Sequence, residues 1–318
     1  AGAARAAAHA APHAMQAPLR ALLPLPPTEA QREVAQVAYD AMEVGGCAFL
    51  EAPTGTGKTM AVLGVALAWQ WAQVAIGDVP RVLWVARTHE QLLHAVREFR
   101  RLPYRPVMSL RLSRERFCLH PNVRTARNKA EACEIATKLD PASAAGRGRK
   151  GSGKAPPPAG CSYLEHAEAI RYPAGPDHFQ RFELGGPLDT YDIEDLVREA
   201  EDLHICPFHA VGDLAMEGAG LVFMTYNQLL DPLIRFAGGY EPLLQGAVVA
   251  VDEAHNIAAE AREVASFAAT AEELEALRGH FEALAMQLPD MDGSRITRRL
   301  VAAAGLLRQW LLADGARG

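Results

Sequence analysis

Residues 52–59, with the sequence Ala-Pro-Thr-Gly-Thr-Gly-Lys-Thr, have the residue types and spacing of a loop that binds nucleotide phosphates. Glycine adopts backbone angles that other residues avoid, so Gly55 and Gly57 let the chain turn its N–H groups inward around an anion. The Lys58 ammonium can reach the β- and γ-phosphates, and the Thr59 hydroxyl can ligate Mg²⁺. The candidate ATP-binding residues are therefore Ala52, Pro53, Thr54, Gly55, Thr56, Gly57, Lys58 and Thr59.

The segments on either side of this loop agree with that interpretation. The apolar run 47–50 predicts a short buried strand with Cys47 in the core, and the apolar segment 60–75 predicts a helix. The N-terminus of that helix would add partial positive charge beside the phosphates. Ala52 departs from the usual pattern, which has glycine at this position. The alternative is a glycine turn that contains Gly-Lys-Thr by chance.

A second group of candidate residues comes directly after another apolar run. Residues 247–251 predict a buried strand, and the sequence Asp-Glu-Ala-His follows at 252–255. Asp252 would lie near the phosphate loop and hold the Mg²⁺ shell, while Glu253 would orient and deprotonate the attacking water. His255 would couple the nucleotide state to a neighbouring element. The catalytic candidates are Lys58, Asp252, Glu253 and His255.

Four of the five cysteines lie in the middle of the chain. Cys118, Cys133, Cys161 and Cys206 are separated by 14, 27 and 44 intervening residues, so none forms the closely spaced pair of a zinc ribbon. An iron–sulphur cluster tolerates wide spacing because the cluster is itself a large template. Three interpretations stay open, namely a [4Fe–4S] cluster, a zinc site, or scattered buried thiols, which are the commonest state of cysteine. The aromatic residues near Cys161 and Cys206 favour a site that shields sulfur from water.

Polar residues also occur at the end of one predicted strand and at the start of one predicted helix. Arg87, Thr88 and His89 follow the strand 82–86 and suit a phosphodiester backbone, although Thr88 could equally be a helix cap. Gln31 lies in the first turn of the helix predicted over residues 29–42. Its carboxamide can both donate to and accept from an adenine edge, and the alternative is a simply exposed side chain.

The elements that must position these residues alternate along the chain. Strands are predicted at 82–86, 221–224 and 247–251, and helices at 29–42, 60–75 and 90–99. Such alternation predicts an α/β fold with a mostly parallel, doubly wound sheet. Residues 103–220 interrupt the alternation and contain the four clustered cysteines, so we expect an inserted subdomain, with a disordered loop at 141–160. From residue 258 the pattern is helical, with breaks expected at Pro289 and Gly293.

Composition excludes several classes of protein. The chain of 318 residues contains no apolar run near the roughly 20 residues of a membrane span, and five cysteines do not make a secreted disulfide scaffold. The net charge is −6, yet residues 81–129 contain 12 Lys and Arg against 3 Glu, which is a basic lobe suited to a polyanion. Residues 189–202 contain seven acids, so a solvated, salt-bridged surface is the alternative.

The order of the motifs EAPTGTGKT, ARTHEQL, LSRERFCLHPNV, GCSYLE, CPF, TYNQLLDP and VDEAHNI resembles the XPD-like superfamily 2 DNA helicases that contain an iron–sulphur domain. This group includes the Fanconi anaemia group J and telomere-elongation-regulator helicases. The resemblance covers roughly residues 28–260, and residues 189–197 are most similar to the telomere-regulator branch. It implies an ATP-dependent 5′→3′ DNA helicase with a RecA-like P-loop motor domain, an inserted [4Fe–4S] domain and a helical arch.

The same resemblance implies cofactors, partners and site residues. ATP, Mg²⁺ and a [4Fe–4S] cluster held by Cys118, Cys133, Cys161 and Cys206 are the implied cofactors. Single-stranded or forked DNA and repair or replication proteins are the implied partners, with no membrane and a monomeric state. The implied DNA-binding residues are Arg87, Thr88, His89, Arg114, Tyr226 and Asn227. The nucleus is the implied location, and an organelle is the alternative if the Ala-rich leader is a transit peptide.

These inferences divide the chain into parts. The predicted parts are a disordered leader at 1–27, the first part of the motor domain at 28–102, the iron–sulphur domain at 103–216, the second part of the motor domain at 217–260 and a truncated arch at 261–318. The chain does not begin with Met and shows no motifs of a second motor domain, so we expect a fragment or processed product that hydrolyses ATP slowly and does not unwind.

Three hypotheses follow. The first is the iron–sulphur DNA helicase, and the second is a nucleotide- and cluster-binding module without motor activity. The third is a zinc-containing NTPase that acts on RNA.

Overall fold

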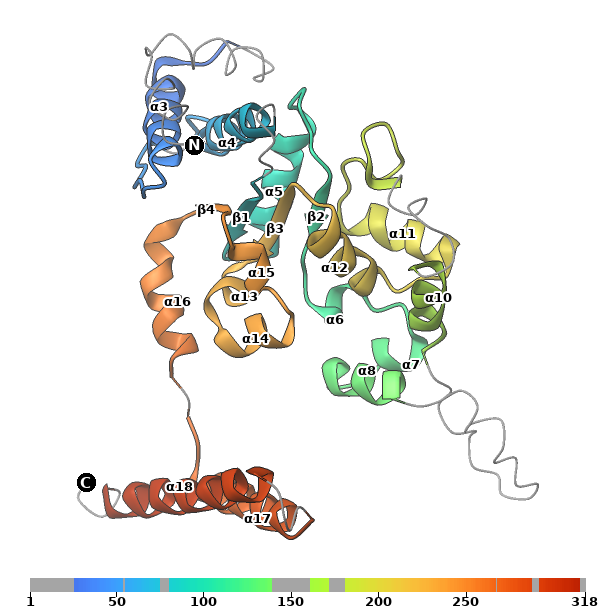
Figure 1. The fold of residues 1–318 in the computed structure, drawn as a ribbon, viewed down its shortest axis with the longest axis vertical. Coiled ribbons are helices and arrows are strands. Elements are labelled where there is room, and N and C mark those ends of the chain that lie inside the picture. Colours follow the sequence, from blue (N-terminus) through green and yellow to red (C-terminus); the bar gives the residue numbers. More distant parts are fainter. Residues whose placement is uncertain are drawn as a thin grey trace. The chain divides into compact units, whose positions relative to one another are not determined.

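The computed structural model describes residues 26–53, 55–74, 80–138, 161–171, 181–266, 268–287 and 292–314 (Figure 1). Backbone packing divides the chain into two compact units, Ala1–Ala261 and Arg262–Gly318. The leader as far as residue 25, the predicted loop at 141–160, the loop residue Thr54 and the predicted break at Pro289 lie outside the described residues.

A parallel sheet lies at the centre of the first unit (Figure 1). Its described strands are β1 (Val82–Ala86), β2 (Met108–Leu110), β3 (Leu221–Thr225) and β4 (Val248–Val251), in the spatial order β2-β3-β1-β4. Every pairing is parallel, and Val82 lies opposite both Leu221 and Val248. The predicted α/β class and the three predicted strands are therefore confirmed. Because these strands run in one direction and in register, the residues that follow β1, β3 and β4 meet at one edge.

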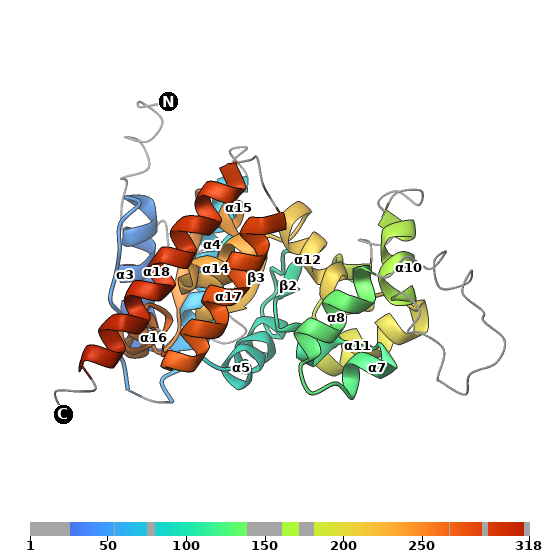
Figure 2. The same ribbon diagram turned by 90° about the horizontal axis from the view of Figure 1, so that it is seen from below.

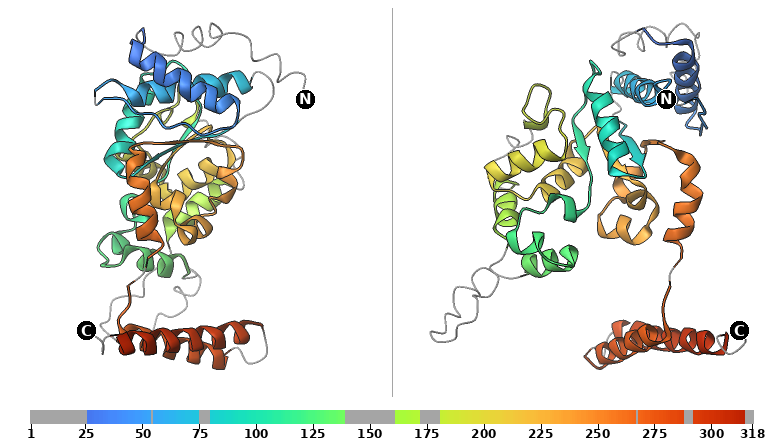
Figure 3. Two further views of the ribbon diagram at one scale, coloured as in Figure 1. Left: turned by 90° about the vertical axis from the view of Figure 1, so that its left-hand side faces the viewer. Right: turned by 180° about the vertical axis from the view of Figure 1, so that it is seen from behind.

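Three helices on the N-terminal side confirm the helices predicted at 29–42, 60–75 and 90–99. They are α3 (Glu29–Glu43), α4 (Lys58–Val74) and α5 (His89–Arg100). Figure 3 shows α3 lying beside α4. Burial is deepest along α4, where Leu63 and Leu67 are almost completely inaccessible because the helix is covered on both sides. Removing so much apolar surface from water is the main force that holds α4 on the sheet.

The strand predicted at residues 47–50 is wrong, because residues 46–50 are irregular. The described sheet ends at β4, and no described strand pairs with this segment. A short apolar run takes an extended, buried form only when neighbouring strands supply hydrogen bonds and cover its side chains. Phe49 is consequently 91% exposed, and Cys47 is exposed rather than in the core as predicted.

Six helices lie between β2 and β3 in the described part of the chain. They are α6 (Arg114–Phe117), α7 (Pro121–Arg124), α8 (Lys129–Lys138), α10 (Ser162–Arg171), α11 (Ile193–Leu203) and α12 (Pro207–Glu217). β2 falls inside the segment predicted as inserted, yet it pairs with β3 in the main sheet, so the insertion would begin beyond Leu110. Phe117, Leu196 and Val211 share the main hydrophobic core, so this region is packed onto the sheet.

The acidic segment predicted from the charge pattern neutralises part of the basic lobe. Arg100 lies 2.6 Å from Asp195, and Arg105 lies 3.2 Å from Asp189. The salt-bridged alternative is therefore confirmed for these arginines. Arg116 is exposed and forms no ion pair with any residue that the structure describes, so it is available to an external anion.

Short helices follow β3 and β4. They are α13 (Tyr226–Leu230), α14 (Pro232–Ala237), α15 (Glu241–Leu244) and the 3₁₀ turn η2 (Ala254–Asn256). The next helix, α16 (Ile257–Val264), contains the boundary between the two units. Asp231 caps α14 by accepting hydrogen bonds from two backbone amides of its first turn.

The second unit contains two long helices, α17 (Ala271–Gln287) and α18 (Asp292–Asp314), which pack side by side (Figure 2). The helical character predicted for this region is confirmed, but the break predicted at Gly293 is wrong because Gly293 lies in the first turn of α18. An open helix end tolerates glycine, whose cost is largest in a helix interior. No described helix is long and apolar enough to span a membrane.

Candidate functional site

The phosphate loop connects the irregular segment after α3 to the N-terminus of α4. Gly55 and Gly57 have φ values of +82° and +76°, which lie in the left-handed region that favours glycine. Lys58 is the first residue of α4 and donates from Nζ to the Ala52 carbonyl. The Thr56 hydroxyl donates to the Pro53 carbonyl at 2.8 Å. In this structure the Lys58 and Thr56 side chains therefore donate to carbonyls of the loop itself. A bound phosphate would accept hydrogen bonds from these same donors.

Gln31 lies directly against this loop. Its Oε1 accepts from the Thr28 amide at 3.0 Å, and its own amide donates to the Thr28 hydroxyl at 3.2 Å. A Cβ added to Gly57 would lie 2.4 Å from the Gln31 Nε2. The side chain predicted to read adenine is thus part of the capping box at the start of α3, and it lies beside Gly57 of the loop. Adenine contact by Gln31 stays a prediction.

Asp252 directly follows β4 (Val248–Val251) at the edge of the sheet. Its backbone amide donates to the Val85 carbonyl at 2.8 Å, which extends the ladder beyond the strand. Burial raises the pKa of the Asp252 carboxyl, the Glu253 charge raises it further, and His94 and Lys58 lower it. Sequence reasoning missed His94, because its place on the face of α5 toward Asp252 depends on the packing of that helix.

The remaining residues of this motif are more exposed. Glu253 has φ +53° in the left-handed region, a conformation that carries strain for a non-glycine residue. The His255 Nδ1 lies 3.2 Å from the Glu253 Oε2. Strained backbone at the end of a strand is common where a side chain must be aimed at a reacting group.

Tyr226 links β3 to the Asp-Glu-Ala-His motif. Its ring is 1% exposed, and its hydroxyl donates to the backbone carbonyl of Asp252. Burial and the charges of Asp252 and Glu253 raise the pKa of Tyr226 to about 12. Asn227, the next residue, is exposed. The adjacent candidates Tyr226 and Asn227 therefore have different surroundings: Tyr226 holds the backbone of Asp252, while Asn227 faces solvent.

The residues after β1 lie at the same edge of the sheet. The Thr88 hydroxyl accepts from the Gln91 amide at 3.3 Å and caps α5, so the capping alternative is confirmed for Thr88. Burial lowers the pKa of His89, and the charge of Arg116 lowers it further. Arg116 was missed by sequence reasoning, which chose Arg114 from the same motif.

Arg114 is turned away from this edge and toward the cysteines. Its guanidinium lies 5.1 Å from the centre of the Phe208 ring. Burial raises the pKa of Cys133, and the charge of Arg114 and a hydrogen bond from its side chain oppose that shift. DNA contact by Arg114 stays a prediction, while its contact with a cysteine is a feature of the fold.

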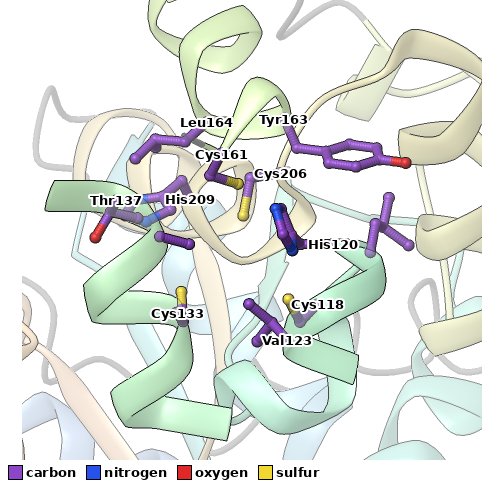
Figure 4. A pocket seen from close by; sticks show the side chains of 12 residues that line it. Cys118, His120, Val123, Cys133, Thr137, Cys161, Tyr163, Leu164, Cys206 and His209 are labelled. Atoms are coloured by element: carbon purple, nitrogen blue, oxygen red, sulfur yellow. The ribbon is translucent and has the colours of Figure 1, made fainter. Parts of the chain in front are cut away.

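The four clustered cysteines line one small cavity that is partly open to solvent (Figure 4). They come from four separate elements: Cys118 follows α6, Cys133 lies in α8, Cys161 precedes α10, and Cys206 precedes α12. All four are free thiols. Sequence spacing alone left scattered buried thiols as an alternative. That alternative is wrong, because all four cysteines line the same cavity.

The cavity is an unfavourable place for isolated thiolates. Burial raises the pKa of Cys118 and Cys133, and it raises the pKa of Cys206 to about 11. Nearby cysteines raise these values further, because like charges repel. A cationic ligand would remove both penalties. Among the described residues, no group of three or more His, Cys, Asp or Glu side chains is arranged to hold a single metal ion.

Together, the parallel sheet, the phosphate loop and the carboxylates at the strand ends define an α/β domain of the P-loop NTPase class. A family model described as DEAD_2 matches residues 84–274, which is more than half of the chain. The chain belongs to this family.

The chain also matches curated proteins. "Regulator of telomere elongation helicase 1" of Mus musculus is 29% identical over 281 residues, which cover 77% of this chain and 21% of that protein. The protein described as its homolog in Drosophila virilis is 31% identical over 274 residues, covering 74% of this chain and 24% of that protein. The chain thus spans about a fifth to a quarter of the length of these curated relatives.

Two solved structures are similar in outline. "XPD_Helicase" aligns with a TM-score of 0.47 and 15% sequence identity, covering 87% of this chain and 40% of that chain. "Truncated XPD" aligns with a TM-score of 0.45 and 16% identity, covering 84% of this chain and 63% of that chain.

Proposed function

We propose that this chain forms the nucleotide-binding motor half of an ATP-dependent 5′→3′ DNA helicase. The observation that supports this most directly is the loop before α4, where Gly55 and Gly57 have left-handed backbone angles and Lys58 begins the helix, together with the Asp252 carboxyl after β4, whose pKa the charge of Lys58 lowers. Asp252 directly follows β4, which runs parallel to β1 and in register with it, so Asp252 lies at the edge of the sheet where β1 and β3 also end. A cation for phosphate oxygens beside a carboxylate for Mg²⁺ is the minimum that phosphoryl transfer requires.

Each residue of this edge has a proposed role. Lys58 leaves the Ala52 carbonyl and binds the β- and γ-phosphates, while the glycine-rich backbone donates its N–H groups to the same oxygens. Thr59 and Asp252 would hold Mg²⁺, which supplies neutralisation of phosphate charge. Glu253 orients the attacking water and takes its proton, and His255 transmits the nucleotide state through its contact with Glu253.

A nucleotide-binding measurement tests this proposal. Lys58→Ala should weaken ATP binding at least about tenfold, because a charge-assisted hydrogen bond contributes roughly 1.5–3 kcal/mol. Lys129→Ala removes the same charge from α8 and serves as the matched control. Equal ATP affinity in the wild type and Lys58→Ala would overturn the proposed site. Turnover that rises with single-stranded DNA would separate a motor from a binding module.

The four cysteines fit an iron–sulphur cluster. Free thiols from four elements line one cavity, and their buried thiolates need a cationic partner. We propose that Cys118, Cys133, Cys161 and Cys206 hold a [4Fe–4S] cluster, which would supply a rigid crosslink between these elements and a centre for one-electron transfer. The chain's own residues shield this site, since Val123 and Leu164 cover the cavity with apolar surface.

Iron and acid-labile sulphide, measured after anaerobic purification, test the cluster. We expect about four irons per chain with absorbance near 400 nm, and their loss in Cys118→Ser. Cys47→Ser is the matched control because Cys47 is exposed and lies outside the cavity. Zinc, or no metal, in a folded wild-type chain would contradict the cluster.

The proposed DNA path follows the edge formed by the residues after β1 and β3. Arg87, His89 and Asn227 lie at these strand ends, and the free Arg116 is close enough to affect His89. Single-stranded or forked DNA is therefore the proposed partner, by phosphate contacts that carry no sequence information. Preference for RNA over DNA of the same sequence would contradict this assignment. A nuclear role in DNA repair or genome maintenance is proposed from the names of the curated relatives.

A further inference from the structure

His120 is a buried polar side chain on the wall of the cysteine cavity. The residue lies between α6 and α7, two positions after Cys118, and is 9% exposed. Its Nδ1 atom is buried and has no hydrogen-bond partner among the described residues. Figure 4 shows the imidazole in the cavity, in the space between Cys118 and Cys206.

An imidazole nitrogen in this position requires an explanation. Buried polar atoms are almost always hydrogen-bonded, and each exception indicates strain, a functional role or a missing partner. The His120 backbone is not strained, since its φ is −63° and its ψ is 121°. The remaining explanation is a partner that occupies the cavity.

Several other donors around the cavity already have partners. The backbone amide of His120 donates to the Cys118 sulfur, and the amides of Phe208 and His209 donate to the Cys206 sulfur. The Thr137 hydroxyl lines the same cavity but donates to the Glu134 carbonyl at 2.9 Å. His120 therefore differs from Thr137 in having an unused polar atom at the cavity wall.

We propose that the Nδ1–H of His120 donates a hydrogen bond to a sulfur atom of the iron–sulphur group that the four cysteines hold. This inference rests on the cluster assignment made above. An electron added to such a group increases negative charge on its sulfur atoms, so a donor aimed at sulfur stabilises the reduced form. His120 is thus a positioning residue that raises the reduction potential of the group.

An anaerobic redox titration followed by absorbance tests this proposal on the full 318-residue chain. His120→Leu removes the donor and should lower the reduction potential at unchanged iron content. His120→Gln keeps an N–H donor of similar reach and should retain the wild-type potential. Thr137→Val is the matched control, because it removes a polar group from the same wall whose hydroxyl is already bonded within the helix.

The outcomes separate this inference from the cluster assignment. Four irons in the wild type, with the same potential in His120→Leu as in Thr137→Val, would overturn the role of His120 and leave the cluster in place. Absence of iron from the wild type would overturn both. If His120→Leu alone loses its iron, His120→Gln decides: iron retained at the wild-type potential supports the donor. Loss of iron from His120→Gln as well would show that the site needs the shape of the imidazole ring and not its donor, and would overturn the proposed hydrogen bond.

Discussion

Arg87 and Glu260 form an ion pair that joins the end of β1 to helix α16, with 3.4 Å between the Arg87 Nε and the Glu260 Oε2. The Arg87 side chain is 50% exposed, whereas the Glu260 side chain is 13% exposed. Both charges also act on the Tyr226 hydroxyl, which holds the backbone of Asp252. A residue proposed to bind DNA is therefore paired with the helix that follows the Asp-Glu-Ala-His motif.

This pair predicts competition between Glu260 and a DNA phosphate for Arg87. Glu260→Gln should tighten binding of single-stranded DNA by up to about fivefold, because a half-exposed ion pair contributes roughly 0–1 kcal/mol. Arg87→Ala should weaken binding and reduce the slope of log K against log salt by about 0.7. Fluorescence anisotropy of a labelled oligonucleotide across a salt series measures both effects.

A double-mutant cycle gives the control for this competition. Glu260→Gln should have no further effect in the Arg87→Ala background. Glu90→Gln removes the same charge from the first turn of α5, and it measures the general effect of one fewer carboxylate. Equal tightening by Glu260→Gln and Glu90→Gln would show that the ion pair does not compete with DNA.

Gly57→Ala should damage the nucleotide site. The φ of +76° is strained for alanine, and the added methyl would meet the Gln31 carboxamide, so the loop and α3 must shift together. We expect a loss of ATP affinity of about tenfold or more, measured by isothermal titration, because the strain of a left-handed residue is roughly 1–3 kcal/mol. Gly279→Ala in α17 is the control, since a methyl there meets no atom within 4 Å.

Tyr191 should make the fold sensitive to alkali. Its ring is fully buried, its hydroxyl accepts from the Leu110 amide at 3.0 Å, and burial raises its pKa above the usual value of 10. A raised folded-state pKa contributes stability that is complete below pH 10 and is lost as the pH rises beyond that value. Urea unfolding of the wild type should therefore show a falling free energy of unfolding above pH 10.

Tyr191→Phe provides the comparison for this prediction. The variant leaves the Leu110 amide without its acceptor, so it should lose about 1–3 kcal/mol at neutral pH. Its stability should then fall less steeply than that of the wild type above pH 10. Parallel curves for the two proteins would assign the alkaline transition to other tyrosines, such as Tyr104, whose pKa burial also raises.

Arg114 should matter for the cysteine cavity more than for DNA affinity in general. Its guanidinium hydrogen-bonds Cys133 and covers the Phe208 ring, so Arg114→Gln removes a positive charge beside a thiolate. We expect faster loss of iron to a chelator than in the wild type, measured by absorbance near 400 nm. Arg127→Gln, an exposed position without an ion pair among the described residues, should lose iron at the wild-type rate.

The local signals in the sequence predicted most of the sheet and the helices. The strand over Val82–Ala86 and the capped helices α3 and α5 follow from apolar periodicity and from Thr28 and Thr88, whose hydroxyls bind amides only three residues away. Such interactions act within a few residues, so they can be predicted before the fold is known. The phosphate-loop glycines belong to the same group, because their left-handed backbone angles are local.

Long-range relationships were decided by the tertiary structure. Residues 47–50 are as apolar as a strand, but no described strand pairs with them. Arg114 and Arg116 are neighbours in one motif, and only the packing of α6 turns the first toward Cys133 and leaves the second near His89.

Residue types and their spacing predicted the candidate phosphate-binding residues, the candidate metal ligands and the α/β class of the fold. Only the folded chain brings four widely spaced cysteines to one cavity, lets the charge of Lys58 act on Asp252, and pairs Arg87 with Glu260. The physical reason is that these contacts depend on strand register and helix packing across the whole unit, which emerge only when the apolar faces are buried together.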